Sequence, residues 1–389
     1  MEFEFEGAAV KKKDNNPEKN TEQTLTVQME ADKEQETAAD LEKERARRRK
    51  KIRRKRAMRF WDRLAGFIIV TVLVVGCACL GLEYIILKGP SPALRSMFIS
   101  TMEETRRFRF IPLIFMTPEE LAEEMTSQPT ETELSTNKEL ITVAAKEETK
   151  TDNHTDDYGL VDEDGDGIIF LEVKGNGYMG YMTVILDPTR VFVGKPDEYG
   201  GVGLTLEQMV QKYNAIGGIN AGGFKDDGGG GLGGQPEGLT IVDGVAYSKD
   251  SISTEGFAGL DRNGILHVGF YSYEECVENG IVHAVSFGPI LISNGDPVEP
   301  PSSSVNPRTA IGQRADGAIL MLVVDGRQVH SIGATYQDMM DIMLDYGAVN
   351  AINMDGGSST VMYYDGRYVN SCSAEYGQPR PLPDAWLYK

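Results

Sequence analysis

The sequence predicts an α+β fold: a sheet-rich mixed domain with many hairpins and two or more helices, preceded by one transmembrane helix. Three observations lead to this prediction. From about residue 158 onward, short β-branched runs alternate with turn dipeptides. Two segments of that region carry apolar residues at helical spacing. Upstream, residues 65–82 run without one charged side chain, which is long enough to span a bilayer.

Composition narrows the class of protein. The chain has 389 residues, 41% of them hydrophobic, which suffices for one sizeable folded unit with attached segments. Its net charge is −20, and 12 of its 39 Lys and Arg fall between Lys43 and Arg59, so the remainder is strongly acidic. This acidity argues against nucleic acid as a partner. With four Cys, four His and no CxxC or HExxH pattern, zinc-finger and zinc-protease sites have no support.

The chain is expected to have four segments. Residues 1–59 lack an apolar period and are predicted to form a disordered cytoplasmic tail that ends in a basic juxtamembrane block. Residues 60–87 are predicted to be the transmembrane helix. Residues 88–157 read as an extracellular connector and stalk, and residues 158–389 as the folded domain. Within the connector, Thr117, Pro118 and Glu120 predict a helix start with a capping box.

The basic block predicts the orientation of the span. Cations flanking an apolar helix stay in the cytoplasm, so the chain is expected to be single-pass in the cell membrane, amino end inside and bulk outside. The block is also expected to contact anionic lipid. Three alternatives remain: a cleaved signal peptide, a lipoprotein box at Val74–Cys77, and a buried core helix. The long charged leader argues against a signal peptide, and the apolar run that continues to Leu87 argues against the lipoprotein box. The 12 flanking cations argue against a buried core helix.

Apolar alternation predicts ten strands in the domain. They are residues 168–173, 178–186, 190–193, 216–220, 239–242, 265–270, 282–287, 318–324, 349–354 and 360–364, with a further strand-like run at 309–313. Residues 205–213 and 335–346 have helical spacing, and Thr335 with Asp338 resembles a capping box. Tight turns, which favour antiparallel hairpins, are predicted at Asp243-Gly244, Asn263-Gly264, Asn294-Gly295, Asp316-Gly317 and Asp365-Gly366.

Gly-bearing loops place polar residues at strand ends, which is how many sites are built. Five loop-like stretches are considered, residues 220–224, 288–289, 306–309, 325–327 and 353–360, and all but 306–309 contain glycine. In the last of them an apolar strand delivers Asp355, two glycines let backbone amides face an anion, and hydroxyl donors follow. The alternative for any one loop is a tight turn whose Asp caps its own backbone. Arg308 is placed to grip a phosphate, although a surface ion pair in an acidic domain is equally compatible with its position.

The order of short motifs carries a resemblance. NAGGF, GPILISNG, NPRTAIG, VVDGR followed by HSIGAT and a helix, NMDGGSST and a closing YYDGRYVN occur in succession. Together they resemble the phosphodiester glycosidase family over about residues 168–389, and NMDGGSST with PRTAIG is the most specific pair. The resemblance implies a catalytic domain that hydrolyses a sugar-1-phosphodiester at the anomeric carbon.

The resemblance also implies which residues line the site. These are Asn220, Arg308, Asp325, Asp355, Gly356, Gly357, Ser358 and Ser359. Asp355 is expected to supply the carboxylate that stabilises positive charge or activates water, and Arg308 with the backbone of residues 356–358 to bind phosphate. Because a phosphate is a good leaving group, a second essential carboxylate is not required; Asp325 and Glu237 are the candidates for one. His330 is expected to contact substrate.

Two departures from the family pattern concern the site. The early turn appears as Asn220-Ala221-Gly222-Gly223-Phe224 and leads into a Gly-rich run to Gly234, which is predicted to be a mobile flap or an insertion near the site. Asp338 stands where Glu is expected, and is interpreted as a helix cap.

No cofactor is expected, and a divalent metal such as calcium remains open. Asp162, Asp164 and Asp166 match the first half of a calcium loop, but Val173 stands where the bidentate Glu belongs. An EF-hand-like site, a looser calcium contact and an acidic linker turn are therefore all open, as is a metal between Asp355 and phosphate. Whether Cys276 and Cys372 form a disulfide is also left open.

These observations predict an extracellular, membrane-anchored hydrolase of sugar-1-phosphodiesters such as α-GlcNAc-1-phosphodiester, in cell-wall or exopolysaccharide metabolism of a bacterium. Its expected partners are a glycosyl phosphodiester or cell-surface polysaccharide and membrane lipid, with no nucleic acid. The alternative is a non-catalytic assembly protein that binds an anionic polysaccharide on the same fold. Asp355 within DGGSS favours the enzyme, because a pure anion binder gains nothing from a carboxylate beside phosphate.

Overall fold

A computed structural model describes residues 17–104, 108, 110–121, 134–143, 155–225, 231–248, 256–299, 304–374 and 377–389. The chain divides into two compact units, residues 1–83 and residues 84–389. Of the predicted Gly-rich flap, residues 226–230 lie outside the described residues. Residues 231–234 are described, and the carbonyls of Leu232 and Gly234 accept from Gly203 N at 2.7 Å and Gly200 N at 2.8 Å.

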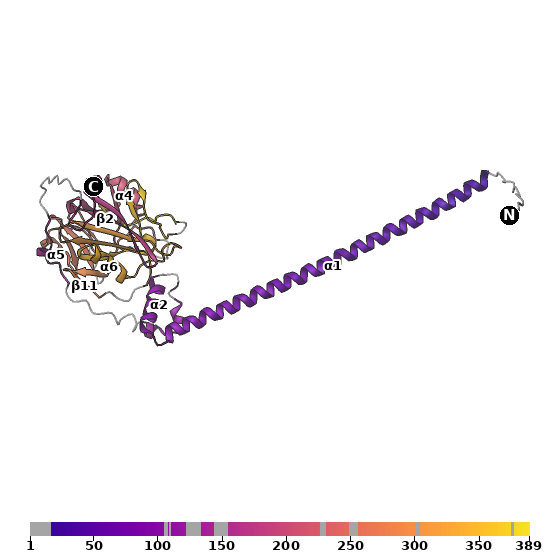
Figure 1. The fold of residues 1–389 in the computed structure, drawn as a ribbon, viewed down its shortest axis with the longest axis horizontal. Helices are drawn as coiled ribbons and strands as arrows, with labels where there is room; N and C mark the ends of the chain where they lie inside the picture. Colours follow the sequence, from indigo (N-terminus) through magenta and orange to yellow (C-terminus); the bar gives the residue numbers. More distant parts are fainter. Residues whose placement is uncertain are drawn as a thin grey trace, which may run out of the picture. The chain divides into compact units, whose positions relative to one another are not determined.

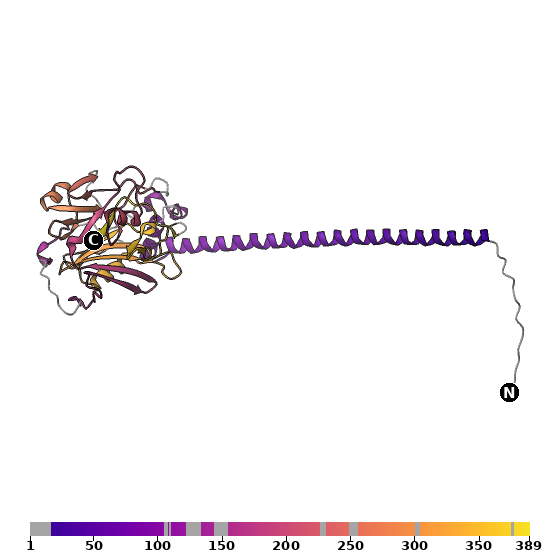
Figure 2. The same cartoon turned by 90° about the horizontal axis from the view of Figure 1, so that it is seen from above.

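The first unit is formed by most of helix α1 (Pro17–Lys88), drawn as one uninterrupted helix in Figure 1 and Figure 2. It contains one stretch that is long and apolar enough to cross a membrane by length and composition, with a mean hydropathy of 2.6. The structure continues this helix upstream to residue 17, where the composition predicts a disordered tail. Ala, Glu, Lys and Arg are strong helix formers, and Arg48 pairs with Glu44 at helical spacing (2.9 Å), so local propensity supports a helix without packing partners.

The second unit begins with a short helical segment. Helix α2 (Pro92–Glu104) and the 3₁₀ turn η2 (Pro112–Ile114) surround a small core of Leu87, Ile99, Met116 and Leu121. The predicted capping box is confirmed: Thr117 N donates to Glu120 Oε2 at 2.9 Å, and Glu120 N donates to Thr117 Oγ1 at 3.1 Å.

Part of the predicted stalk packs on the domain. Residues 134–143 include the 3₁₀ turn η3 (Lys138–Leu140). Thr136 N donates to the Tyr271 hydroxyl at 2.9 Å, and Thr142 N donates to the carbonyl of Ala315 at 2.8 Å. The prediction of a flexible stalk is therefore wrong for residues 134–143. Residues 122–133 and 144–154 lie outside the described residues.

A seven-stranded sheet is the largest layer, in the order β1-β2-β13-β12-β14-β10-β11. Its strands are β1 (Ile168–Gly175), β2 (Tyr178–Ile185), β10 (Ile290–Ser293), β11 (Asp296–Pro297), β12 (Arg308–Arg314), β13 (Ile319–Val324) and β14 (Ala348–Met354). Each pairing in it is antiparallel.

Two five-stranded antiparallel sheets complete the β-structure, in the orders β16-β15-β4-β17-β3 and β6-β5-β9-β7-β8. The first contains β3 (Val191–Gly194), β4 (Gly217–Asn220), β15 (Met362–Tyr364), β16 (Arg367–Tyr368) and β17 (Ala385–Tyr388). The second contains β5 (Thr240–Val242), β6 (Val245–Ser248), β7 (Phe257–Asp261), β8 (Leu266–Gly269) and β9 (Ile281–Ser286).

The predicted α+β class and its hairpins are confirmed. All ten predicted strands are present, and each of the five turn dipeptides joins two neighbouring strands. Asp243, Asn294 and Asp365 have φ between 49° and 56°, and each precedes a Gly that also has positive φ, as a type I′ hairpin turn requires.

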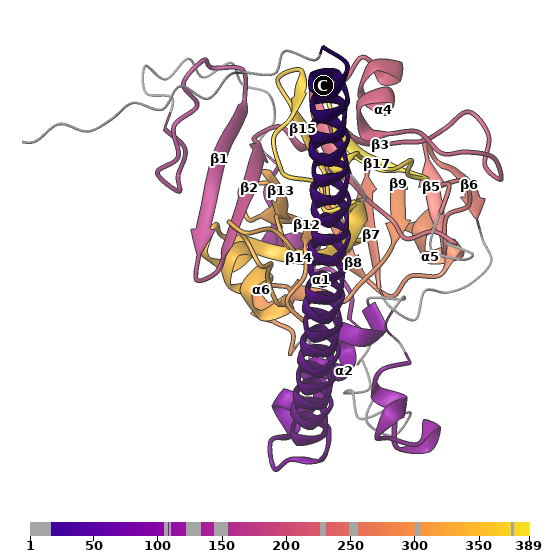
Figure 3. The same cartoon turned by 90° about the vertical axis from the view of Figure 1, so that its right-hand side faces the viewer.

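Period-two alternation divides the core into two faces. On β13, Ile319, Met321 and Val323 face the two smaller sheets, whereas Leu320, Leu322 and Val324 pack on the other side of the sheet. That other side is covered by helix α6 (Tyr336–Asp345), which carries Met339, Ile342 and Met343 into the core. Figure 3 shows α6 beside β12 and β14.

The remaining helices have capped starts. Helix α4 (Leu206–Tyr213) packs on the sheet of β3, β4 and β17, and Thr205 closes its capping box with Gln208. Helix α5 (Tyr273–Glu278) packs on β9. Asp338 closes the box of α6 with Thr335, so its interpretation as a cap is confirmed.

Candidate active site

The strand register brings several predicted residues to one edge of the large sheet. Arg308 opens β12 and pairs with Val324, after which the chain reaches Asp325. On the other side of β12, Thr309 pairs with Met354, which precedes Asp355. Because antiparallel neighbours run in opposite directions, the start of β12 and the ends of β13 and β14 meet at the same edge. Arg308, Asp325 and Asp355 lie in separate motifs, so their order in the sequence does not indicate that they share this edge.

Asn220 joins this edge to the sheet of β4. It is fully buried, and its Nδ2 donates to the carbonyl of Asp355 at 2.6 Å. Its Oδ1 accepts from Thr309 Oγ1 at 2.8 Å and from Val361 N at 3.1 Å. The described hydrogen bonds of this side chain therefore hold loops together, and its predicted contact with substrate stays a prediction.

The Asp355 loop is fixed through its backbone. Asp355 N donates to the carbonyl of Ala221 at 3.0 Å, and Gly357 N donates to the carbonyl of Pro307 at 2.9 Å. Gly357 has a φ of +60°, and Ser359 is buried within the 3₁₀ turn η5 (Gly357–Ser359). A Cβ on Gly356 would lie 2.8 Å from the oxygen of Pro307, so the close approach of the two loops requires glycine there.

Arg308 is buried rather than displayed, with 3% exposure. Its Nη2 donates to the carbonyl of Ser304 at 2.9 Å, its Nε donates to the carbonyl of Ala334 at 3.3 Å, and its guanidinium lies 4.0 Å from the centre of the Tyr336 ring. A phosphate at Arg308 would have to share donors that already serve the fold. Its predicted role in phosphate binding is untested.

Asp325 and His330 form a carboxylate–imidazole pair. Asp325 is fully buried, and its Oδ2 lies 3.0 Å from Nε2 of His330, whose side chain is 44% exposed. Asn370 Nδ2 and Ser371 N donate to the other carboxylate oxygen at 3.2 and 2.9 Å. A buried carboxylate that orients an exposed imidazole suits proton transfer at the His, with Asp325 acting through it.

Glu237 lies beside Gly223, close to the Asn220 turn. Its backbone N donates to the carbonyl of Gly223 at 2.9 Å, and a Cβ on Gly223 would lie 3.8 Å from Glu237 Oε2. Glu237 is exposed, so its carboxylate can reach a ligand that binds at this turn.

Two arginines flank the glycine turn that follows Asp355. A Cβ on Gly357 would lie 3.7 Å from both terminal nitrogens of Arg327. Arg380 Nη1 donates to Ser358 Oγ at 2.9 Å, and its guanidinium lies 4.5 Å from the centre of the Phe224 ring. Arg327 is exposed and Arg380 is half-buried, so both guanidinium groups lie nearer to solvent than Arg308 does.

Asp384 is a further carboxyl group at this site. It directly precedes β17, is 1% exposed, and accepts a hydrogen bond from Gly222 N at 2.7 Å. Burial raises the pKa of Asp384 to about 7, and the negative charge of Asp355 adds to this shift.

Sequence reasoning missed Asp384 and Arg380 and considered Arg327 only as part of its loop. The available signal was their position: Arg380 lies in a Pro-rich segment, and Asp384 stands directly before the apolar run Ala385–Tyr388. That run is only four residues long, too short to predict a strand by alternation.

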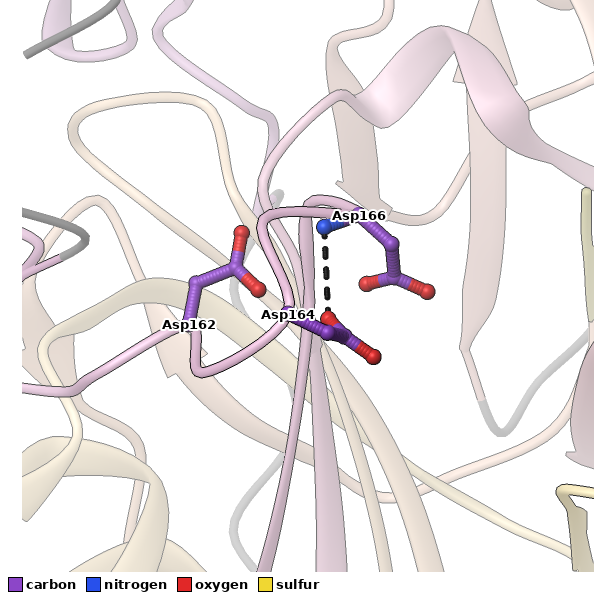
Figure 4. A group of neighbouring side chains, drawn as sticks. All are labelled: Asp162, Asp164 and Asp166. Carbon is purple, nitrogen blue, oxygen red and sulfur yellow. Dashed lines mark hydrogen bonds between the residues drawn. The ribbon is translucent and has the colours of Figure 1, made fainter.

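A cluster of three acids lies before β1. Ligand atoms of Asp162, Asp164 and Asp166 all lie within 4.8 Å of one another, and Figure 4 shows the three side chains on one loop. Asp162 accepts hydrogen bonds from Gly165 N and Gly167 N at 3.0 and 2.9 Å, so it also stabilises the turn itself. Burial, then the charges of the other two acids, raise the pKa of Asp166. The loop-turn alternative thus has direct support, and calcium binding there stays a prediction.

The cysteines of the domain are unpaired. Cys276 and Cys372 are both buried, in different hydrophobic clusters, and neither forms a disulfide. Burial raises the pKa of Cys276 to about 12, so its thiol is a poor nucleophile.

Comparison with known proteins identifies the class. Residues 213–389 match the family model described as phosphodiester glycosidase. This part of the chain therefore matches a phosphodiester glycosidase domain, and that family is one of hydrolases.

Several proteins are similar to this domain. The chain is 25% identical over 218 residues to the N-acetylglucosamine-1-phosphodiester alpha-N-acetylglucosaminidase of Mus musculus, covering 50% of this chain and 41% of that protein. It is 30% identical over 204 residues to the SPbeta prophage-derived uncharacterized protein YomE of Bacillus subtilis (strain 168), covering 48% of this chain and 29% of that protein.

The catalytic domain of the zebrafish N-acetylglucosamine-1-phosphodiester alpha-N-acetylglucosaminidase, auto-inhibited by its pro-peptide, aligns with 22% identity and a TM-score of 0.49. The alignment covers 57% of this chain and 81% of that structure. The chain spans less than half the length of the curated relatives described here.

Proposed function

We propose that the domain hydrolyses a glycosyl-1-phosphodiester, such as an α-GlcNAc-1-phosphodiester, at its anomeric carbon. One observation carries the proposal: Asp355 is followed directly by a glycine turn that two guanidinium groups flank, Arg327 at Gly357 and Arg380 at Ser358. A carboxylate beside an anion-binding turn suits a substrate whose reacting carbon bears a phosphate. The similarity to the mammalian glycosidases supports the same substrate class.

The reaction requires few groups. Water attacks the anomeric carbon, the bond from that carbon to the phosphate oxygen breaks, and the electron pair leaves with the phosphomonoester. Asp355 stabilises the positive charge that develops on the sugar or accepts the proton of the attacking water. Arg327, Arg380 and backbone amides of residues 356–358 hold the phosphate, whose negative charge rises as the bond breaks.

The proposal includes a place for the enzyme. Helix α1 contains the apolar stretch, and the basic residues between Lys43 and Arg59 precede it. With the basic side in the cytoplasm, the domain would work outside the cell membrane on wall or capsule polymers.

The test uses residues 84–389, which form one compact unit. The purified fragment is incubated with UDP-N-acetylglucosamine and with a simple α-GlcNAc-1-phosphodiester, and free sugar and phosphomonoester are measured together. Equal release of both products supports the proposal. No release from a folded fragment across a panel of glycosyl-1-phosphodiesters, with retained binding to anionic polysaccharide, would instead establish the non-catalytic alternative.

Arg380→Ala tests phosphate binding. We expect KM to rise about 10- to 150-fold with kcat changed less, because a hydrogen bond between charged groups contributes about 1.5–3 kcal/mol and is present before the reaction begins. Steady-state kinetics on the same fragment measure this. Arg262→Ala is the control, since Arg262 is exposed on the turn between β7 and β8. An unchanged KM for the Arg380 variant would remove this arginine from the phosphate site.

A further inference from the structure

Asp384 has one carboxyl oxygen that its surroundings leave without a hydrogen bond. The side chain is 1% exposed, and its Oδ1 accepts from Gly222 N at 2.7 Å. Its Oδ2 is buried and has no hydrogen-bond partner among the described residues. An ionised carboxylate in this position would carry a large desolvation cost, whereas a protonated acid would not.

The turn of residues 220–222 holds Asp384 and Asp355 together. Asn220 Nδ2 donates to the carbonyl of Asp355, Asp355 N donates to the carbonyl of Ala221, and Gly222 N donates to Asp384. A Cβ on Gly222 would lie 3.1 Å from Asp384 Oδ1 and 3.4 Å from Oδ2, so glycine permits the close contact. The same three residues therefore hold the backbone of Asp355 and the carboxyl group of Asp384.

The titratable groups that influence Asp384 among the described residues are Asp355 and Tyr199. Asp355 acts on Asp384 as a negative charge, and the N–H of Gly222 opposes it. Tyr199 stays neutral because burial, followed by the charge of Asp384, raises its pKa, and its hydroxyl is buried. Among the residues that the structure describes, no cation contributes to the raised pKa of Asp384, so none of them compensates a negative charge there.

We propose that Asp384 is the second carboxyl group of this site, a positioning residue that holds a proton so that the negative charge resides on Asp355. The inference rests on the proposed function. The negative charge of Asp355 acts on Asp384, so ionising both groups is costly, and a neutral Asp384 keeps the charge on Asp355. When Asp384 loses its proton, its charge repels both Asp355 and the incoming phosphate, and activity falls. The alkaline limb of the pH profile then belongs to Asp384.

Asp384→Asn tests this role, because Asn keeps the oxygen that accepts from Gly222 and places a neutral amide where the protonated acid stood. On residues 84–389 we expect kcat/KM within about threefold of the unmodified fragment at pH 6, and no alkaline fall where the unmodified fragment loses about tenfold per pH unit. Asp365→Asn, an exposed acid on the β15–β16 turn, is expected to keep the unmodified profile.

Two kinetic outcomes would overturn the proposal. An alkaline limb that persists in the Asp384 variant assigns the titration to another group. A loss of more than about 100-fold at pH 6 in a folded variant makes Asp384 a proton donor in the reaction rather than a positioning residue.

Thermal unfolding without substrate separates this inference from the proposed function. A carboxyl whose folded-state pKa lies above its unfolded value stabilises fully below the unfolded pKa, and this stabilisation is lost as pH rises through the folded pKa. The unmodified fragment should therefore lose Tm relative to Asp384→Asn between pH 5 and pH 8. An equal Tm difference at both pH values contradicts a protonated Asp384 whatever the activity. The expected Tm result with no hydrolysis by either protein contradicts the catalytic assignment and its positioning role, and leaves only a buried acid.

Discussion

Asp355→Asn is expected to lower kcat about 10³-fold with little change in KM, since a positioned carboxylate contributes about 10²- to 10⁴-fold as an acid or base. The structure explains why the variant should fold. Asp355 is fixed by its backbone N and carbonyl, bonded to Ala221 and Asn220, and Asn has the same shape. Initial rates of sugar release from residues 84–389 measure the loss.

The matched control is Asp365→Asn. Asp365 is exposed on the β15–β16 hairpin turn with a φ of 49°, a conformation that Asn accepts readily, and this variant should keep full activity. If Asp355→Asn retains kcat within about threefold, another group supplies the charge at the anomeric carbon. His330 with Asp325 would then be the first alternative, as a general base oriented by a buried carboxylate.

Arg314→Ala is expected to lower the free energy of unfolding by about 3–5 kcal/mol, because removing one member of a buried ion pair leaves its partners uncompensated. Arg314 is fully buried, its Nη1 lies 2.6 Å from Asp156 Oδ2, and it also pairs with Asp316. Its guanidinium lies 4.0 Å from the centre of the Tyr158 ring. The ion pairs of Arg314 with Asp156 and Asp316 connect the segment before β1 to the β12–β13 turn.

Urea unfolding of residues 84–389, followed by tryptophan fluorescence of the buried Trp386, measures this change. Arg367→Ala is the control, because Arg367 is exposed on β16 and its loss should change stability by less than about 0.5 kcal/mol. A loss below about 1 kcal/mol in the Arg314 variant would show that water reaches Asp156 and Asp316 at little cost.

The fold could largely be predicted wherever a strand is long enough to show alternation. β13 is an apolar run of six residues, β14 has seven residues that are apolar except for Asn350 and Asn353, and Asp or Asn before Gly marks the hairpins. β7 contains Gly259 and β17 has four residues, so neither shows a readable period. Their place is decided by partners distant in sequence, which propensity does not encode.

The site was predictable to the level of its loops but not of its contacts. The Gly-rich motifs mark Asn220 and Asp355 because a turn at a strand end requires such residues. The burial of Arg308 against Tyr336 depends on where α6 packs, and the burial of Asp384 depends on β4 beside β17. Both depend on tertiary packing. The sequence pattern alone therefore assigned phosphate binding to Arg308, which is more buried than Arg327 or Arg380.

The position of β17 bears on when the domain can become active. β17 lies between β3 and β4 and pairs with both, although about 190 and 165 residues separate it from them. Until β17 has been synthesised, β3 has no partner strand in this sheet, β4 has one unpaired edge, and Asp384 is absent from the Asn220 turn. The candidate site can therefore be completed only after β17 has been synthesised. A chain that stops before Asp384 is expected to lack both the strand between β3 and β4 and the buried carboxyl group of the site.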